Sequence, residues 1–235
     1  MTAIFENYES PWMDDELSIL RDAANRFFST EFVPHKDRWI EQGKVDRDAW
    51  NKAGEAGLLC AEIPAQYGGG GGDYRHETIV TEEQFGAGIS GFGNQVHSQI
   101  VAPYLLHYGN EEQKQKWLPK MATGEMVGAI AMTEPNTGSD LQNVKTSATK
   151  KGDSYVVNGA KTYITNGIHA DLVVLVAKTD PNLGAKGISL IIVEANTKGF
   201  NKGRNLKKLG LNSGDTAELF FDDCVVPRAN LLGPE

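Results

Sequence analysis

Several features that would place a protein in a specialised class are scarce in this sequence. Only two cysteines occur among the 235 residues, Cys60 and Cys224. A disulfide framework is therefore excluded, and two free thiols are favoured over a single bridge. The longest apolar runs, such as 172–177 and 188–193, are far shorter than the roughly 20 residues that span a membrane. Basic residues are also in deficit: 23 Lys and Arg against 31 Asp and Glu give a net charge of −8. That balance argues against binding to the phosphate backbone of nucleic acid.

Targeting signals are missing as well. No Lys or Arg precedes Arg21, and the first 15 residues are acidic and lack an apolar core. We therefore expect a cytoplasmic protein, or a protein of the mitochondrial matrix if a transit peptide has been removed. The remaining composition, with 40% apolar and 23% charged residues, is ordinary for a globular protein. A chain of this size buries roughly 70–75% of its unfolded surface and needs no disulfide or metal to fold.

The two halves of the chain differ in the period of their apolar residues. In the first half these residues recur at steps of three and four, which predicts amphipathic helices over 17–32, 50–57 and 96–108. Pro34 is expected to end or kink the first helix, and Asn110 to begin a further one. After Glu125 the runs are short and β-rich, and they cover 127–132, 155–157, 161–165, 172–177, 188–193 and 217–221.

This arrangement predicts an α+β fold. Helices followed by strands, without a βαβ repeat, indicate segregated domains. We predict an all-helical N-terminal domain over 1–124 and an antiparallel β-barrel-like or sandwich domain over 125–235. Asn158-Gly159 predicts a two-residue hairpin between strands, and Asn166-Gly167 a further turn.

Common catalytic and nucleotide-binding motifs are not found. The glycine run 68–72 has Asp73 where a dinucleotide fingerprint needs glycine, and no Gly-Lys-Ser/Thr follows, so a flexible surface loop is expected. There is no Gly-x-Ser-x-Gly elbow. His76-Glu77 has no second histidine four positions after His76, and no metal site is predicted.

One segment does point to ligand chemistry. It consists of Ile130, Ala131, Met132, Thr133, Glu134, Pro135, Asn136, Thr137, Gly138 and Ser139. A β-rich run passes into a turn fixed by Pro135, and Gly138 lets backbone approach a ligand closely. Hydroxyl groups and free backbone N–H groups together can form a donor-rich nest for an oxygen-rich cofactor. An ordinary Ser/Thr turn is the alternative.

This segment resembles the flavin-binding signature of the acyl-CoA dehydrogenase family. A second element, 161–167, is similar to the family's aromatic-Ile-Thr/Ser-Asn-Gly strand, and a third, 209–221, to the end of its middle β domain. The helical landmarks 55–58 and 109–113 agree with the family too. These motifs stand in the family's order over nearly the whole chain, and they look most like the long-chain branch.

The resemblance implies FAD as the cofactor, lined by residues 130–139 and by Tyr163, Ile164 and Thr165. Thr165 would donate to flavin N5, and Ser139, Ala185 and Lys186 would contact acyl-CoA. Two features depart from the family's pattern. Tyr163 stands where Trp or Phe is common, and Asn136-Thr137 replaces Gly-Ala, which predicts a stiffer and bulkier loop.

The implied reaction is α,β-dehydrogenation of a medium- or long-chain acyl-CoA thioester, with electrons passed to an electron-transfer flavoprotein. The family's catalytic base lies in a C-terminal helical-bundle domain, which we expect beyond Glu235, and Glu134 is not expected to replace it. We therefore expect weak FAD binding and no turnover from this chain alone, and a dimer or tetramer at full length. The alternatives are a non-catalytic acyl-CoA or acyl-carrier binding module, one subunit of a split enzyme, and an acyl-CoA oxidase.

Overall fold

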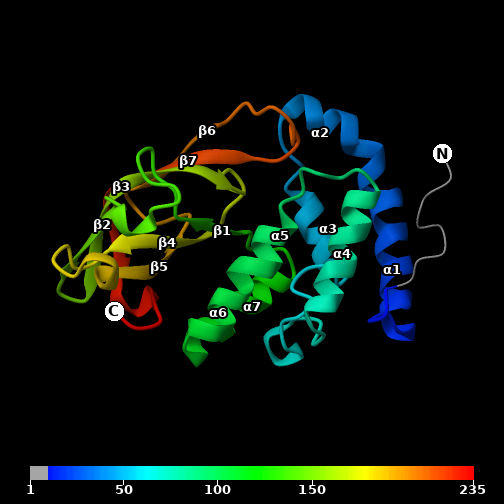
Figure 1. Cartoon of the computed structure of the whole chain (residues 1–235), viewed down its shortest axis with the longest axis horizontal. Helices are drawn as coiled ribbons and strands as arrows, with labels where there is room; N and C mark the ends of the chain where they lie inside the picture. Colours follow the sequence, from blue (N-terminus) through cyan, green and yellow to red (C-terminus); the bar gives the residue numbers. More distant parts are fainter. Residues whose placement is uncertain (1–9) are drawn as a thin grey trace.

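The computed structural model describes residues 10–235, so most of the segment on which the targeting prediction rests lies outside the described residues. The expectation of helices followed by strands is confirmed (Figure 1). The helical part contains α1 (Asp15–Phe27), η1 (Phe28–Phe32), η2 (Val33–His35), α2 (Lys36–Gln42), α3 (Asp48–Glu55), η3 (Ala65–Tyr67), α4 (Tyr74–Gly86), α5 (Asn94–Val96), η4 (His97–Val101), α6 (Ala102–Tyr108) and α7 (Glu111–Ala122).

The first helix follows its apolar pattern and its cap. Asp14 caps α1 by accepting a hydrogen bond from the Leu17 N–H at 2.9 Å. The helix widens into one π-helical turn, η1, just before Pro34. Phe28 and Phe32 pack edge to face across this turn, with ring centroids 5.4 Å apart. Pro34 therefore marks a change of helix type rather than the end of helical structure.

Helix α4 was not predicted from the apolar period. Its buried residues include Glu77 and Gln84 beside Ile79, so the buried face is too polar to give a periodic signal. A capping box starts the helix: Asp73 accepts hydrogen bonds from the first turn, and His76 accepts one from the Asp73 N–H. This cap was the available signal.

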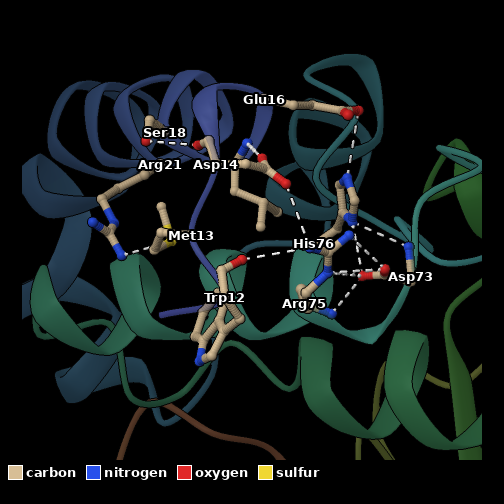
Figure 2. Close-up of polar contacts among 10 residues, drawn as sticks. Trp12, Met13, Asp14, Glu16, Ser18, Arg21, Asp73, Arg75 and His76 are labelled. Carbon is tan, nitrogen blue, oxygen red and sulfur yellow. Dashed lines mark hydrogen bonds and ion pairs between the residues drawn. The ribbon is translucent and has the colours of Figure 1, made fainter. Parts of the chain in front are cut away.

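Figure 2 shows how polar side chains hold the beginning of α4 against the beginning of α1. Arg75 lies 2.9 Å from a carboxylate oxygen of Asp73 and 3.4 Å from one of Asp14. His76 Nε2 lies 3.5 Å from Glu16 Oε1. The side chains that carry the carboxylates of this group are 49–82% exposed, so each pair contributes little to stability.

The glycine run 68–72 is not a loose loop, contrary to expectation. The N–H groups of Gly70, Gly71 and Gly72 donate to backbone carbonyls of the segment 60–63 at 2.9–3.2 Å. A Cβ at Gly69 would lie 2.2 Å from the Ile63 carbonyl oxygen. Glycine is therefore needed here because two backbone segments pack directly against each other.

The β part is an open, mixed sheet. Its strands are β1 (Gly128–Ala131), β2 (Ser147–Lys151), β3 (Ser154–Thr165), β4 (Leu172–Lys178), β5 (Ile188–Glu194), β6 (Phe200–Asn205), β7 (Thr216–Pro227) and β8 (Leu231–Leu232). Short 3₁₀ turns connect them: η5 (Leu141–Asn143), η6 (Gly184–Gly187) and η7 (Arg228–Asn230). The order is β6-β7-β3-β2-β4-β5-β8, with β1 paired to β4. Most pairings are antiparallel as expected, but β1–β4 and β2–β4 are parallel, and the end strands do not close a barrel.

The hairpin predicted at Asn158-Gly159 is wrong, because both residues lie inside β3. The turn between β2 and β3 falls at 152–153 instead. Asn158 exchanges two hydrogen bonds with Asp223 of the neighbouring strand at 3.0 and 2.9 Å. Gly159 has φ +152°, and a Cβ there would lie 2.5 Å from the Thr146 hydroxyl oxygen. The pair marks a β-bulge and a close strand contact rather than a turn. The turn predicted at Asn166-Gly167 is confirmed.

The two parts share a hydrophobic core. Leu105, Trp117 and Met121 of α6 and α7 pack in one cluster with Val174 of β4 and Ile192 of β5. Because the other face of β4 packs into the β core, this strand is buried on both sides, which explains its unbroken apolar run. Residue 124, our proposed boundary, lies in the connection between α7 and β1.

Both cysteines are buried and free, as favoured by the sequence. Within residues 10–235, no helix is long and apolar enough to cross a membrane. The same residues contain no cluster of three or more His, Cys, Asp or Glu side chains suited to a metal ion.

Candidate functional site

The segment singled out by the sequence forms a tight turn after β1. Glu134 and Thr137 exchange backbone hydrogen bonds of 2.9 and 3.0 Å, so Pro135 and Asn136 form the exposed tip of the turn. The Thr137 hydroxyl donates to the Asn143 carbonyl at 3.1 Å and is buried. The turn is therefore rigid at its base and exposed at its tip.

A buried ion pair fixes this turn to the sheet. Lys161 Nζ lies 2.9 Å from Glu134 Oε1, and both side chains are at most 6% exposed. The Glu134 carboxylate also accepts the N–H groups of Lys145 (2.6 Å) and Thr146 (2.9 Å). Lys161 Nζ also donates to the Met132 carbonyl at 2.9 Å. Together these bonds join the beginning of the turn to the middle of β3 and to the segment just before β2.

The ion pair shifts the titration of both partners. Burial raises the pKa of Glu134, but the hydrogen bonds from Thr146, Lys145 and Lys161 outweigh it, and the pKa lies below its usual value. Burial lowers the pKa of Lys161, although Glu134 opposes this change. The lowered pKa keeps Glu134 charged at neutral pH, whereas the burial of Lys161 opposes its charged form and Glu134 favours it.

A β-bulge next to the ion pair displays an aromatic ring. The register of β3 against β7 shifts between Lys161 and Ile164. Tyr163 within the bulge has φ +59°, which is unusual for an aromatic residue, and its side chain is 69% exposed. Such bulges re-aim side chains, and strained backbone of this kind clusters at functional sites. Tyr163 borders a hollow of about 360 Å³ that is also lined by Arg204, Asn205, Leu206 and Lys207.

The bulge and the turn lie side by side. The Thr162 N–H donates to the Thr133 carbonyl at 2.9 Å, which joins the end of β1 to the bulge. Beyond the bulge, the Asn166 side chain donates to the carbonyls of Gly93 and Gly128, at 2.9 and 3.1 Å. These bonds tie the end of β3 to both parts of the molecule.

The predicted cofactor residues fall into three groups by exposure. The exposed ones are Pro135, Asn136, Gly138, Ser139 and Tyr163. The half-buried ones are Ile130, Met132, Thr133 and Thr165. The buried ones are Ala131, Glu134, Thr137 and Ile164. Ala131 and Ile164 belong to the β core, so their side chains support the site from below.

The two predicted acyl-CoA residues in the second loop, Ala185 and Lys186, lie exposed in η6. This turn packs on η5, which follows Ser139 by one residue. The loops after β1 and β4 are therefore neighbours at one end of the sheet.

Three further residues shape this site and were not identified from the sequence. Lys161 and Thr146 hold Glu134, and Asp215 accepts the N–H groups of Ile168 and His169 at 2.7 and 3.2 Å, just after β3. A lysine inside a β-rich run was the available signal for Lys161, because a buried lysine requires an acidic partner.

Comparison with known proteins agrees with this architecture. The model of the acyl-CoA dehydrogenase N-terminal domain matches residues 14–125, and that of the middle domain matches residues 129–224. The chain belongs to the acyl-CoA dehydrogenase family. The long-chain specific acyl-CoA dehydrogenase of Sus scrofa mitochondria is 48% identical over 222 residues, which cover 94% of this chain and 52% of that protein. This chain thus spans about half the length of that curated relative.

Solved structures of family members have the same fold. The acyl-CoA dehydrogenase of Geobacillus kaustophilus superposes with a TM-score of 0.94 at 49% identity, covering 97% of this chain and 60% of that one. A glutaryl-CoA dehydrogenase of Mycobacterium smegmatis, solved in complex with FADH2, has a TM-score of 0.87 at 29% identity, covering 94% and 56%.

Proposed function

We propose that this chain carries the FAD- and acyl-CoA-binding part of an acyl-CoA dehydrogenase. The observation that carries the proposal is the rigid turn 132–139 lying against the bulge that exposes Tyr163. The related structure with bound FADH2 supports the choice of cofactor. When bound, FAD supplies the hydride acceptor for the β-hydrogen of an acyl-CoA thioester.

The residues present fit such a cofactor. The N–H groups of Thr133, Gly138 and Ser139 have no acceptor within residues 10–235, so they are available to an oxygen-rich ligand. The exposed Tyr163 ring offers a stacking surface, and the half-exposed Thr165 hydroxyl lies two residues further along β3. We assign Thr165 as a donor to the flavin ring and Ser139, Ala185 and Lys186 to acyl-CoA.

Glu134 holds the site and does not act as its base. To act as a general base, a carboxylate must be unpaired and within reach of the proton that it removes. The Glu134 carboxylate is buried, ion-paired and occupied by two backbone donors. The side chains of Ala131 and Ile164 are likewise turned into the core, so any contact of these residues with the cofactor is made by their backbone.

The wider setting of the enzyme is part of the proposal. The similarity to a long-chain specific relative supports a long-chain acyl-CoA substrate. We further propose an electron-transfer flavoprotein as electron acceptor and a homo-oligomer as the working form, in the cytoplasm or the mitochondrial matrix.

Titration of FAD into the chain tests the proposal, with flavin fluorescence as the signal. We expect saturable binding, and we expect Tyr163→Ala to weaken it about tenfold because a stacking contact of about 1.4 kcal/mol is lost. Phe220→Ala is the matched control, since Phe220 is an exposed aromatic residue on the adjacent strand β7. Lack of saturable binding, or equal effects of both variants, would contradict the proposed site.

A further inference from the structure

A second hollow lies on the solvent face of the sheet, next to the loops that carry Ser139 and Lys186. Its volume is about 380 Å³. It is lined by Val144, Lys145, Ser147, Thr149, Lys178, Thr179 and Pro181. Of these residues, only Lys145 contacts the flavin turn described above, and it does so through its backbone N–H. The lining is rich in ammonium and hydroxyl groups.

The strands place these side chains together. Along 145–149, exposed or half-buried residues alternate with buried ones, so Lys145, Ser147 and Thr149 share the outer face of β2 and of the segment that leads into it. Lys178 pairs with Ser147 in the parallel β2–β4 register, so it lies on the adjacent strand at the same level. The Lys178 ammonium donates to the Gln142 carbonyl of η5 at 3.3 Å, which holds it at the edge of the hollow.

The two lysines carry charge that no carboxylate within residues 10–235 neutralises at ion-pair distance. The acidic residues closest to them in sequence are used in local turns. Asp140 accepts from the Asn143 side chain, and Asp180 accepts from the Asn182 N–H at 2.8 Å. In a chain of net charge −8, two ammonium groups that lack an acidic partner and border one hollow form a distinct basic site.

The hydroxyl groups add hydrogen-bond donors to this charge. The Thr149 hydroxyl has no partner within the part of the chain that the structure describes, and the Ser147 hydroxyl has only a long contact of 3.5 Å to the Asn158 carbonyl. Ammonium and hydroxyl donors together suit a phosphate group, which offers several strong acceptors and negative charge.

We propose that this hollow binds a phosphate group at the nucleotide end of the acyl-CoA substrate, an inference that rests on the proposed function. The backbone links it to the substrate loop: the N–H groups of Thr179 and Asp180 both donate to the Gly187 carbonyl, at 2.9 and 3.1 Å. Lys186, assigned above to acyl-CoA, directly precedes Gly187. A ligand held at η6 thus reaches the hollow without crossing the sheet.

NMR titration of the whole chain tests this site with three probes: adenosine 3′,5′-bisphosphate, inorganic phosphate and a long-chain acyl-CoA. We expect saturable shifts at 145–149 and 178–181 with the bisphosphate and with acyl-CoA. Replacing both lysines, as Lys145→Gln with Lys178→Gln, is expected to weaken binding of the bisphosphate roughly tenfold. Lys198→Gln, at an exposed lysine in the turn before β6, is the control and is expected to change affinity less than about twofold.

The outcomes separate this inference from the proposed function. Acyl-CoA binding that the double variant leaves unchanged would overturn the phosphate site and leave the proposed function standing. Shifts with bisphosphate but no binding of acyl-CoA anywhere on the chain would contradict both the proposed function and the substrate assignment of the hollow. Inorganic phosphate binding as tightly as the bisphosphate would count against a nucleotide ligand.

Discussion

Two buried glutamates, one in each part of the molecule, show how differently this chain treats a carboxylate. Glu77 on α4 and Glu134 after β1 are at most 6% exposed. Glu134 has a lysine and two backbone donors. For Glu77, one oxygen accepts a long bond of 3.4 Å from the Glu62 N–H, and the other has no hydrogen-bond partner within the described residues.

The pKa values move in opposite directions as a result. Burial raises the pKa of Glu77 to about 7, whereas the donors around Glu134 hold its pKa below the usual value. A buried carboxylate therefore remains charged only where the surrounding groups are built to hold it. In this chain that place is the base of the candidate flavin turn.

Breaking the Lys161–Glu134 ion pair should reduce the stability of the chain more than any other change considered below. Lys161→Met leaves a charged carboxylate buried without its cation, so we expect the free energy of unfolding to fall by about 3–5 kcal/mol. Urea unfolding followed by far-UV circular dichroism measures the change. Because Lys161 also holds the Met132 carbonyl, FAD affinity should fall in the same variant.

A double variant sharpens this prediction. Lys161→Met with Glu134→Leu removes both charges, and it should be more stable than Lys161→Met alone. FAD affinity should nevertheless remain low, since the turn has lost its attachment to β3. If the double variant bound FAD like the unmodified chain, the ion pair would have no positioning role.

Replacing the unpaired carboxylate of Glu77 should change stability less than Lys161→Met does, and it should raise stability rather than lower it. The pKa of Glu77 is about 7 in the folded state, above the reference value of 4.5. The folded state therefore loses stability relative to the unfolded state as the pH rises from 4.5 to 7, because the buried carboxyl group must give up its proton. Glu77→Gln removes this loss. We expect the variant to gain about 2–3 kcal/mol at pH 8 and almost nothing at pH 4.5, as measured by urea unfolding at both pH values.

Glu82→Gln is the matched control for Glu77, because Glu82 is an exposed glutamate on the same helix. Its stability should follow that of the unmodified chain at both pH values. A gain in Glu77→Gln that did not depend on pH would show that packing, rather than buried charge, is responsible.

The smallest effect on stability is expected for an exposed ion pair. Lys116 Nζ lies 2.6 Å from Glu194 Oε1 and joins α7 to β5, but the Lys116 side chain is 51% exposed. We expect Lys116→Gln to cost less than about 1 kcal/mol, because water already solvates the charge. The difference should vanish when unfolding is measured in 1 M salt (about a 3 Å screening length). An effect as large as that of Lys161→Met would contradict this ranking of pairs by burial.

The sequence predicted the order of helices and strands because apolar period and turn residues act locally. It missed α4, where Glu77 and Gln84 interrupt the buried face, and it placed a hairpin at Asn158-Gly159, where the chain continues as a bulged strand. The buried face of α4 gives no periodic signal, whereas at Asn158-Gly159 a contact with a distant segment overrode the local signal. The Asn158–Asp223 pair, for example, joins residues 65 positions apart.

The candidate site, like the fold, was predicted from the sequence only in part. The resemblance singled out the segment 130–139 and the end of β3 at 163–165, but not which of their side chains face outward. That depends on the bulge at Tyr163 and on the Lys161–Glu134 pair, which brings together residues 27 positions apart. Apart from the lysine inside a β-rich run, these features have no local sequence signal, because both depend on contacts between segments that are distant in the sequence.

Amide hydrogen exchange of the chain with and without FAD tests the account most directly. If FAD binds as proposed, exchange will slow at Thr133, Gly138 and Ser139 and around the bulge at Tyr163, while the amides of α4 near Glu77 will not change. Unchanged exchange at the turn and the bulge at saturating FAD, or protection located elsewhere, would contradict the assignment of this site.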